Sequence, residues 1–200
     1  MLGGWHRSSS EALGELGALS DLAVFEQLRI EPFHRTVAAR HPDLAPLVAP
    51  VVEALVKRPG RCLVHGDFSP KNVLVGDGGL WVIDFEVAHV GDPVFDLAFL
   101  ITHLVLKSVH RLAMAGAYRA CAAQFLESYK EEAGAGFVPA DESLALHVGC
   151  LVLARVDGKS PAGYLTAEEQ ERAWGVGLGL LRHGVHPLAS GAWPGGPLPL

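Results

Sequence analysis

The sequence predicts an α+β fold that is mainly α-helical and carries one small β insert. Apolar residues recur at helical spacing over long stretches on both sides of the insert. Between residues 62 and 83, by contrast, the apolar runs are too short for helices and are separated by polar loops. Half of the 200 residues are hydrophobic and 19% are charged, which is typical of a globular protein that buries a sizeable core.

The part of the chain before residue 60 is expected to be helical. A serine run at residues 8–10 predicts the start of a helix that continues to Leu28. Pro32 is expected to open a second helix, because proline is favoured in a first turn. Asp43 is the predicted N-cap of a third helix, which ends at Arg58 in front of a proline and a glycine.

Three short apolar runs predict the strands of the β insert. They cover residues 62–64, 73–75 and 80–83. The segment 76–79, Gly-Asp-Gly-Gly, predicts a hairpin turn between the last two strands. The polar loop 65–72 is therefore held between strands, a common arrangement for active sites.

The chain is expected to return to helices after residue 92. Residues 94–106 are apolar nearly all round, which indicates a buried central helix. Further helices are predicted over 111–132 and from Asp141 to residue 158. Thr166, with a glutamate three residues later, predicts a capping box at the start of the last helix. Residues 186–200 are rich in proline and glycine and are expected to form an irregular tail.

Composition and charge exclude several classes of function. The chain has 16 basic and 22 acidic residues, a formal charge of -6, and no basic run, which argues against a nucleic-acid or anionic-membrane partner. No apolar stretch reaches the about 20 residues of a membrane span. The three cysteines are widely spaced, so buried thiols are favoured over a zinc site or disulfides. We expect a soluble, cytoplasmic protein.

Three polar residues of the β insert suggest a reaction. Asp67 and Asn72 lie five positions apart in the loop after the first strand, and Asp84 follows the last strand. Phosphoryl transfer from ATP uses one carboxylate to orient the attacking hydroxyl, and an amide and a second carboxylate to hold Mg²⁺. Each residue could instead stabilise a local turn. Their occurrence together favours phosphoryl transfer.

The motifs around these residues resemble those of a known family. His65-Gly66-Asp67 through Asn72, Ile83-Asp84, and the segment 91–98 (Gly-Asp-Pro-Val-Phe-Asp-Leu-Ala) are similar to the aminoglycoside phosphotransferase and choline kinase group, which are relatives of the protein kinases. Residues 2–6 are more loosely similar to the opening of the family's C-terminal lobe. The resemblance implies the C-terminal, catalytic lobe of a protein-kinase-like fold, and we assign residues 1–185 to it.

The resemblance also implies a role for each matching residue. Asp67 matches the catalytic aspartate, which orients the acceptor hydroxyl and takes up its proton. Asn72 and Asp84 match the Mg²⁺ ligands of the nucleotide site. Asp96 matches a buried aspartate that braces the catalytic loop through its backbone, and His65 is expected to support the same loop. ATP and Mg²⁺ are therefore the expected cofactors.

Two charged residues near this motif allow two interpretations each. Lys71 precedes Asn72 and could neutralise the γ-phosphate of ATP, but it could equally be a solvent-exposed loop lysine. Glu86 stands where the protein-kinase D-F-G motif has glycine. It could reach a second metal or a cationic substrate, or be a solvated loop acid.

The segment 155–161 resembles a region that flanks the acceptor pocket in bacterial members of the family. Arg155 and Lys159 could therefore contact the substrate. A cation-rich helix end that stops at Gly158 is the interpretation that the sequence favours. The Gly-Lys-Ser at 158–160 is not a phosphate-binding P-loop, because the position that requires a glycine holds Leu153. Glycines 175, 177 and 179 predict close helix packing rather than a nucleotide loop.

No glycine-rich loop and no strand-borne lysine precede Asp67, although the family's N-terminal β lobe supplies both to ATP. We therefore expect that the N-terminal lobe is absent, or is provided by a separate chain. The predicted function is ATP-dependent transfer of the γ-phosphate to a hydroxyl of a small molecule, by a chain that is weakly active or inactive alone. The alternative is a non-catalytic, kinase-like module that binds a ligand or partner. The acidic balance only faintly favours a cationic acceptor.

Overall fold

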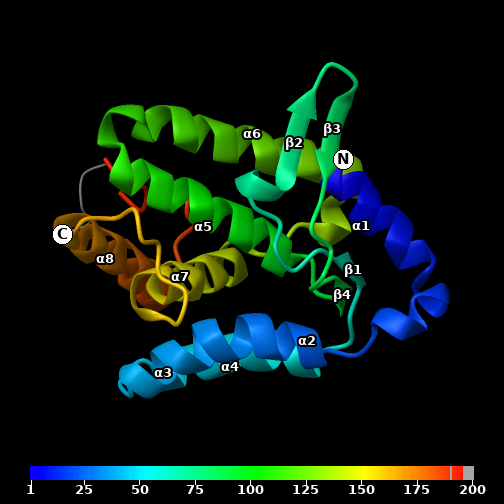
Figure 1. Ribbon diagram of the computed structural model, residues 1–200, viewed down its shortest axis with the longest axis horizontal. Coiled ribbons are helices and arrows are strands. Elements are labelled where there is room, and N and C mark those ends of the chain that lie inside the picture. Colours follow the sequence, from blue (N-terminus) through cyan, green and yellow to red (C-terminus); the bar gives the residue numbers. More distant parts are fainter. Residues whose placement is uncertain (190, 196–200) are drawn as a thin grey trace.

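The chain is mainly helical with small antiparallel sheets, as predicted (Figure 1). The computed structural model describes residues 1–189 and 191–195. The helices and short helical turns are α1 (Leu2–Glu11), η1 (Leu13–Glu15), η2 (Gly17–Leu19), α2 (Ala23–Phe25), η3 (Glu26–Arg35), α3 (Thr36–Arg40), α4 (Ala45–Lys57), η4 (Pro70–Asn72), α5 (Val94–His110), η5 (Leu112–Met114), α6 (Ala115–Ala133), η6 (Ala135–Phe137), α7 (Asp141–Asp157) and α8 (Ala167–His183). The strands are β1 (Cys62–Val64), β2 (Val73–Gly76), β3 (Gly79–Val82) and β4 (His89–Gly91).

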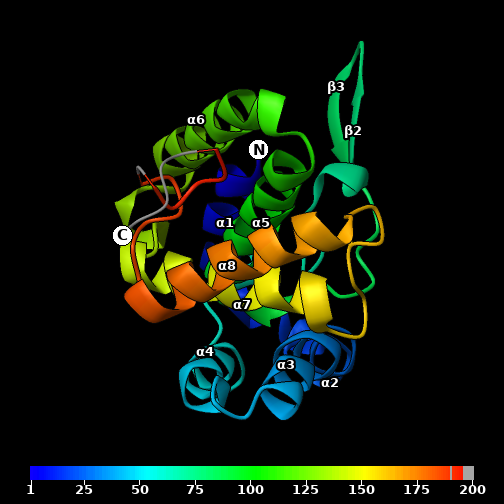
Figure 2. The same cartoon turned by 90° about the vertical axis from the view of Figure 1, so that its left-hand side faces the viewer.

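Helix α5 lies at the centre of the core, which confirms the prediction from its apolar sequence. All but four of its 17 residues are buried, and Phe95, Leu97, Ile101 and Leu106 are fully enclosed. Helices α6, α7 and α8 pack against it. Figures 1 and 2 show α2, α3 and α4 as a separate layer on the far side of α7 from α6. Each large side chain buried on α5 contributes about 1.5–3 kcal/mol, so this helix anchors the elements of the site.

Helices α7 and α8 approach each other closely at two glycines. A Cβ atom on Gly149 would lie 2.8 Å from the backbone nitrogen of Leu181 and 2.9 Å from the carbonyl oxygen of Gly177. The predicted close packing at the glycines of α8 is therefore confirmed for Gly177. It is wrong for Gly175 and Gly179, which have open space where a side chain would be.

Two separate two-stranded sheets make up the β insert. Strand β1 pairs antiparallel with β4, and β2 pairs antiparallel with β3. In the second sheet Gly76 opposes Gly79, so Asp77 and Gly78 form the two-residue turn expected of this sequence. Figure 1 shows this hairpin projecting from the helices. Strand β4 was not predicted, because three residues that include a histidine and a glycine carry no strand pattern.

The predicted helix start at the serine run is wrong. Helix α1 begins at Leu2, and the serines lie in its last turns. Ser9 Oγ donates to the His6 carbonyl at 3.1 Å and accepts the backbone N–H of Leu63 in β1 at 2.9 Å. Packing decides this start, because α1 lies so close to α6 that a Cβ on Gly3 would be 2.7 Å from the Tyr129 carbonyl oxygen. Nor does one helix continue to residue 28, since η1, η2 and α2 intervene.

The predicted roles of Pro32 and Asp43 are also wrong. Pro32 lies inside η3, a π-helix, rather than at a helix start. The carbonyl of Pro32 accepts the backbone N–H of Lys159 at 3.0 Å, so a contact with a distant segment holds this unusual turn. Helix α4 begins at Ala45, and its N-cap is Leu44 without a side-chain hydrogen bond. Asp43 instead lies 3.9 Å from Arg182 of α8.

The predictions for the C-terminal part were more accurate. Thr166 Oγ1 accepts the Glu169 N–H at 3.3 Å, and Glu169 Oε2 accepts the Thr166 N–H at 2.8 Å, which confirms the capping box. The N-cap of α7 is Ala140, one residue before Asp141. In the tail, residues 186–189 and 191–195 contain no helix or strand, whereas residues 190 and 196–200 lie outside the described residues. Trp193 is nevertheless buried and donates to the Ala115 carbonyl.

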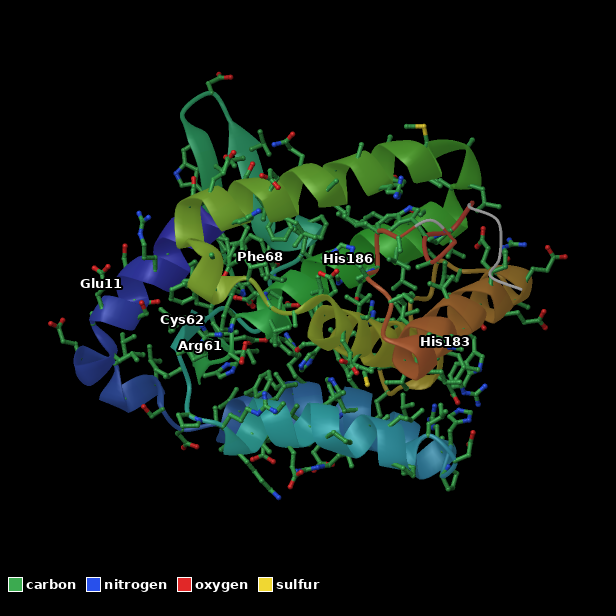
Figure 3. All side chains as sticks on the ribbon, turned by 180° about the vertical axis from the view of Figure 1, so that it is seen from behind. Glu11, Arg61, Cys62, Phe68, His183 and His186 are labelled. Carbon is green, nitrogen blue, oxygen red and sulfur yellow. The ribbon has the colours of Figure 1, made fainter. Side chains whose placement is uncertain are left out.

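The cysteines follow the prediction in part. Cys62 and Cys150 are buried, but Cys121 on α6 is exposed, where it lines an apolar pocket with Phe125. Figure 3 shows Cys62 next to Arg61 at the start of β1. Among the helices of residues 1–189 and 191–195, none has both the length and the apolar character needed to cross a bilayer.

Candidate active site

The loop between β1 and β2 brings Asp67 and Asn72 into direct contact. Asn72 Nδ2 donates to the Asp67 side-chain oxygen Oδ2 at 3.0 Å and to the Asp67 carbonyl at 2.9 Å. The short turn η4 places the amide there, since the Asn72 N–H bonds the Ser69 carbonyl at 3.0 Å. Both side chains are nearly buried, at 5% and 3% exposed. The segment between the two residues thus forms a closed loop, in which the Asn72 amide contacts the Asp67 carboxylate.

Two cations also contact the carboxylate of Asp67. Lys71 Nζ lies 2.9 Å from Asp67 Oδ2, and a guanidinium nitrogen of Arg29 lies 3.4 Å from the same oxygen. Three groups therefore converge on Oδ2. The other oxygen, Oδ1, has no hydrogen-bond or ion-pair partner among the described residues. The carboxylate is held in a fixed orientation with one oxygen available.

Sequence reasoning missed Arg29, which lies on η3. Its Nε donates to the Gly66 carbonyl at 2.7 Å, and its guanidinium lies 5.7 Å from the centre of the Phe99 ring. Burial lowers the pKa of Arg29 below its ordinary value. The carboxylates of Asp67, Glu86 and Asp84 act in the opposite direction. No motif marks this arginine, so only the folded chain reveals that it links η3 to the loop.

Asp96 of α5 fixes the backbone at the start of the loop. Its fully buried carboxylate accepts the backbone N–H of His65 at 2.7 Å and that of Gly66 at 2.9 Å. It also accepts from His6 Nε2 at 3.2 Å, and His6 Nδ1 accepts from the Tyr129 hydroxyl at 2.9 Å. The bracing contact expected of Asp96 is therefore present, and His6 connects it to α1 and α6. Charged acceptors such as this carboxylate make the strongest backbone hydrogen bonds.

His65 connects the loop to the segment that carries Asp84. Its Nε2 donates to the Ile83 carbonyl at 3.0 Å, while Nδ1 accepts the Asp67 N–H at 3.2 Å. The Ile83 N–H in turn bonds the Asn72 carbonyl at 3.0 Å. Both peptide groups of Ile83 are thus fixed on the loop, which places Asp84 beside it. Gly66 permits the close turn here, because its φ is +77° and a Cβ would lie 2.7 Å from the Val87 carbonyl oxygen.

Asp84 has an unusual backbone conformation. Its φ is +72°, and it is the one non-glycine residue of the described chain in the left-handed region. Such conformations cost about 1–3 kcal/mol and are found at functional sites more often than elsewhere. The next residue, Phe85, packs on the rings of Trp5 and His65 at centroid distances of 5.3 and 4.9 Å. That packing holds the backbone in the strained conformation.

The available oxygens at this site suit a small divalent cation. Asn72 is bonded only through its amide nitrogen, so its Oδ1 has no partner within the described residues. The exposed carboxylate of Asp84 likewise makes no hydrogen bond or ion pair there. Mg²⁺ is bound through one or two carboxylates, waters and substrate phosphates rather than by a complete protein cage. Asn72 and Asp84 therefore fit the pair of protein ligands that such an ion needs.

The remaining predicted residues lie around this centre. Glu86 is exposed in the turn after Asp84, close enough to raise the pKa of Arg29. Lys159 is exposed, and only its backbone makes a hydrogen bond, to Pro32. Arg155 is half-buried, and its guanidinium donates to the carbonyl and hydroxyl oxygens of Ser160. Arg155 therefore stabilises the turn after α7, in agreement with the helix-end interpretation.

Comparison with known proteins adds a family assignment to this geometry. No curated protein matches the chain. The family model described as "Phosphotransferase enzyme family" matches residues 1–131. The match covers more than half of the chain and includes α1, the loop around Asp67 and Asn72, and the segment around Asp84 and Asp96. The chain therefore belongs to the phosphotransferase enzyme family.

Proposed function

We propose that the chain is the catalytic lobe, of protein-kinase-like fold, of an ATP-dependent phosphotransferase that acts on a hydroxyl of a small molecule. The observation that carries this proposal is the closed loop in which the Asn72 amide donates to the Asp67 carboxylate at 3.0 Å. Ile83 ties Asp84 to the same loop through two backbone hydrogen bonds. Membership of the phosphotransferase family supports the reaction class.

Asp67 is the proposed acceptor of the substrate proton. Its Oδ2 is occupied by the Asn72 amide, Lys71 and Arg29, and its Oδ1 is left for the hydroxyl. A hydroxyl that donates to Oδ1 would have its oxygen aimed at the phosphoryl group and would pass its proton to the carboxylate as the new P–O bond forms. Fixing the carboxylate in advance lowers the entropic cost of reaching this arrangement.

Asn72 and Asp84 are the proposed holders of the metal ion. Mg²⁺-ATP, when bound, would supply the phosphoryl group and a cation that offsets the charge on its oxygens. Lys71 is 63% exposed and already pairs with Asp67, so its ammonium is placed to neutralise a phosphate that arrives above the loop. Asp96 and His65 are positioning residues, because they act on the backbone of the loop.

A second lobe is the proposed cover of the nucleotide. The hairpin β2–β3 exposes apolar side chains that a soluble protein ordinarily buries, with Val75 81%, Leu80 51% and Trp81 50% exposed. We propose that a β-rich lobe, on a preceding segment or on another chain, packs over this hairpin and encloses ATP. The cytoplasm, where ATP is available, is the proposed location.

A transfer assay tests the function. Phosphorylation of a panel of small hydroxyl compounds would be followed with radiolabelled ATP and Mg²⁺, using the chain alone and the chain joined to a β-rich nucleotide lobe. Asp67→Asn is expected to lower the rate about 10²–10⁴-fold, the usual contribution of a positioned general base. Asp43→Asn, at an exposed position before α4, is the matched control and should leave the rate unchanged. Transfer that persists in Asp67→Asn, or a joined protein that phosphorylates nothing, would favour a non-catalytic binding module.

A further inference from the structure

One face of the buried helix α5 reaches solvent, and it is basic. The four residues of α5 that are not buried are Leu100, His103, Lys107 and His110, which follow one another at intervals of three, four and three. This spacing puts them on a single side of the helix. Three of the four carry an imidazole or an ammonium group, although the helix is otherwise almost entirely apolar. His110 already pairs with Glu169 of α8 at 3.1 Å, so His103 and Lys107 are the two basic residues whose chemistry needs another explanation.

A chain of contacts connects this face to Asp67. The His103 ring lies 5.2 Å from the Phe99 ring, and the Arg29 guanidinium lies 5.7 Å from the centre of the same ring. Arg29 then reaches Asp67 Oδ2 at 3.4 Å. The basic face of α5 therefore begins one aromatic ring away from the guanidinium that contacts the proposed catalytic carboxylate.

Arg155 adds a further cation to the same region. It lies in the last turn of α7, which packs against α5, and it donates only to Ser160. Its Nε is buried without a hydrogen-bond partner among the described residues. Neither Arg155 nor Lys107 forms an ion pair within residues 1–189 and 191–195. Partial burial of a guanidinium without an anionic partner costs free energy, and a ligand that supplies the anion would offset this cost.

The electrostatics agree with this arrangement. Burial, together with the nearby Arg155, lowers the pKa of His103 to about 4. Lys107 and Lys71 act in the same direction, and Asp67 acts against them. Burial lowers the pKa of Arg155, and Tyr164 and then Asp67 act against this effect. Among the groups that shift these two residues, Asp67 is the only carboxylate within the part of the chain described here.

We propose that the acceptor of this phosphotransferase is a small hydroxyl compound that carries an anionic group, such as a carboxylate or phosphate. Arg155 and Lys107 bind the anionic group, with His103 beside them, while the hydroxyl lies at Asp67. This inference rests on the function proposed above and names its substrate class. A polycationic acceptor would instead be repelled by Arg155 and Lys107, neither of which has a carboxylate partner within the described residues. The positive charge around the site thus favours an anionic acceptor, whereas the overall acidity of the chain faintly favoured a cationic one.

Binding measured without ATP and Mg²⁺ tests the charge of the acceptor. Two matched sets serve as probes: glucosamine, glucose and glucuronate, and ethanolamine, glycerol, glycerate and glycerol 3-phosphate. Calorimetry or ligand-observed NMR on the whole chain is expected to show at least 10-fold tighter binding of an anionic member than of its neutral and cationic counterparts. A bound anion should also raise the pKa of His103, followed through its ring resonances, because it offsets the nearby cations.

Variants show whether the binding uses the proposed residues. Arg155→Gln is expected to weaken binding of the anionic probe about 10–100-fold, as for the loss of a hydrogen bond to a charged group. Arg172→Gln, at an exposed position on α8, is the control and should bind normally. If Arg155→Gln unfolds, Lys107→Gln carries the same test with an expected loss of about 10-fold.

The outcomes separate this inference from the proposed function. Equal or tighter binding of the cationic probes, failure of every anionic probe to bind at 10 mM (about 10,000-fold weaker than a micromolar ligand), or unchanged binding in Arg155→Gln and Lys107→Gln would overturn the inference. Because no nucleotide is present, these binding results do not decide whether the chain transfers a phosphoryl group, which the transfer assay tests separately. Conversely, anionic probes that bind but are never phosphorylated would support an anion site and count against the proposed reaction.

Discussion

Acidification is expected to destabilise this protein through two buried histidines. His34 lies on η3 and His147 on α7, and their side chains are 1% and 3% exposed where these two elements pack together. Both ring nitrogens of His34, and Nδ1 of His147, have no hydrogen-bond partner among the described residues. The same two elements carry Arg29 and Arg155, so a charge buried here would loosen the site as well as the core.

The size of the effect follows from the pKa values. Burial lowers the pKa of His34 to about 4 and, together with the proximity of His34, that of His147 to about 3. In the unfolded chain both would titrate near their ordinary value of about 6.5. As the pH falls through 6.5, the unfolded state takes up protons that the folded state does not, so stability is full above this pH and is lost below it. At pH 5 the loss is about 2 kcal/mol for each histidine, so this pair accounts for about 4 kcal/mol of the 5–15 kcal/mol typical of a folded domain.

Urea unfolding at pH 7.5 and pH 5.0, followed by circular dichroism, measures this loss. The lower limit is pH 5.0 because carboxylates become protonated at more acidic pH and their ion pairs are then lost as well. Asp157, whose pKa is lowered by its hydrogen bond with His41, is one example. The variant His34→Leu is expected to lose about 2 kcal/mol less than the wild type between the two pH values, because His103, whose pKa is also lowered, is present in both proteins. His183→Leu, at an exposed position, should behave like the wild type. Equal stability of the wild type at both pH values, or an undiminished loss in His34→Leu, would refute the reasoning.

Two further predictions concern single hydrogen-bond acceptors. Asp96→Asn should lower the free energy of unfolding by about 2–4 kcal/mol, because one of the two oxygens that accept the His65 and Gly66 N–H groups becomes an NH₂. Asp92→Asn, where the side chain accepts only the Val94 N–H, should cost less than about 1 kcal/mol in the same urea titration. Thr166→Ala should cost about 1 kcal/mol through loss of the cap, seen as a lower Tm, whereas Thr166→Ser should retain it. A destabilisation of Asp92→Asn equal to that of Asp96→Asn, or an unchanged Tm in Thr166→Ala, would contradict these explanations.

Local sequence was sufficient wherever neighbouring residues decide the structure. The apolar run of α5, the Asp77-Gly78 turn and the Thr166 capping box were predicted because each depends on contacts within a few positions. Asp67 and Asn72 were identified as candidate site residues from their motif, and the structure adds the hydrogen bond from the Asn72 amide to the Asp67 carboxylate. Asp84 was identified by its motif, although its strained backbone was not visible in the sequence.

The tertiary structure alone decided the surroundings of that loop. Arg29 donates a hydrogen bond to the carbonyl of Gly66, which lies 37 positions away in the sequence. No periodicity or motif predicts such a contact. The start of α1 and the π-helix around Pro32 depend in the same way on contacts with α6 and with Lys159. His103 and Arg155 become neighbours of Asp67 only because α5 and α7 pack together. Short-range contacts thus determine the Asp67–Asn72 loop, whereas the charge around it arises from the packing of helices far apart in the chain.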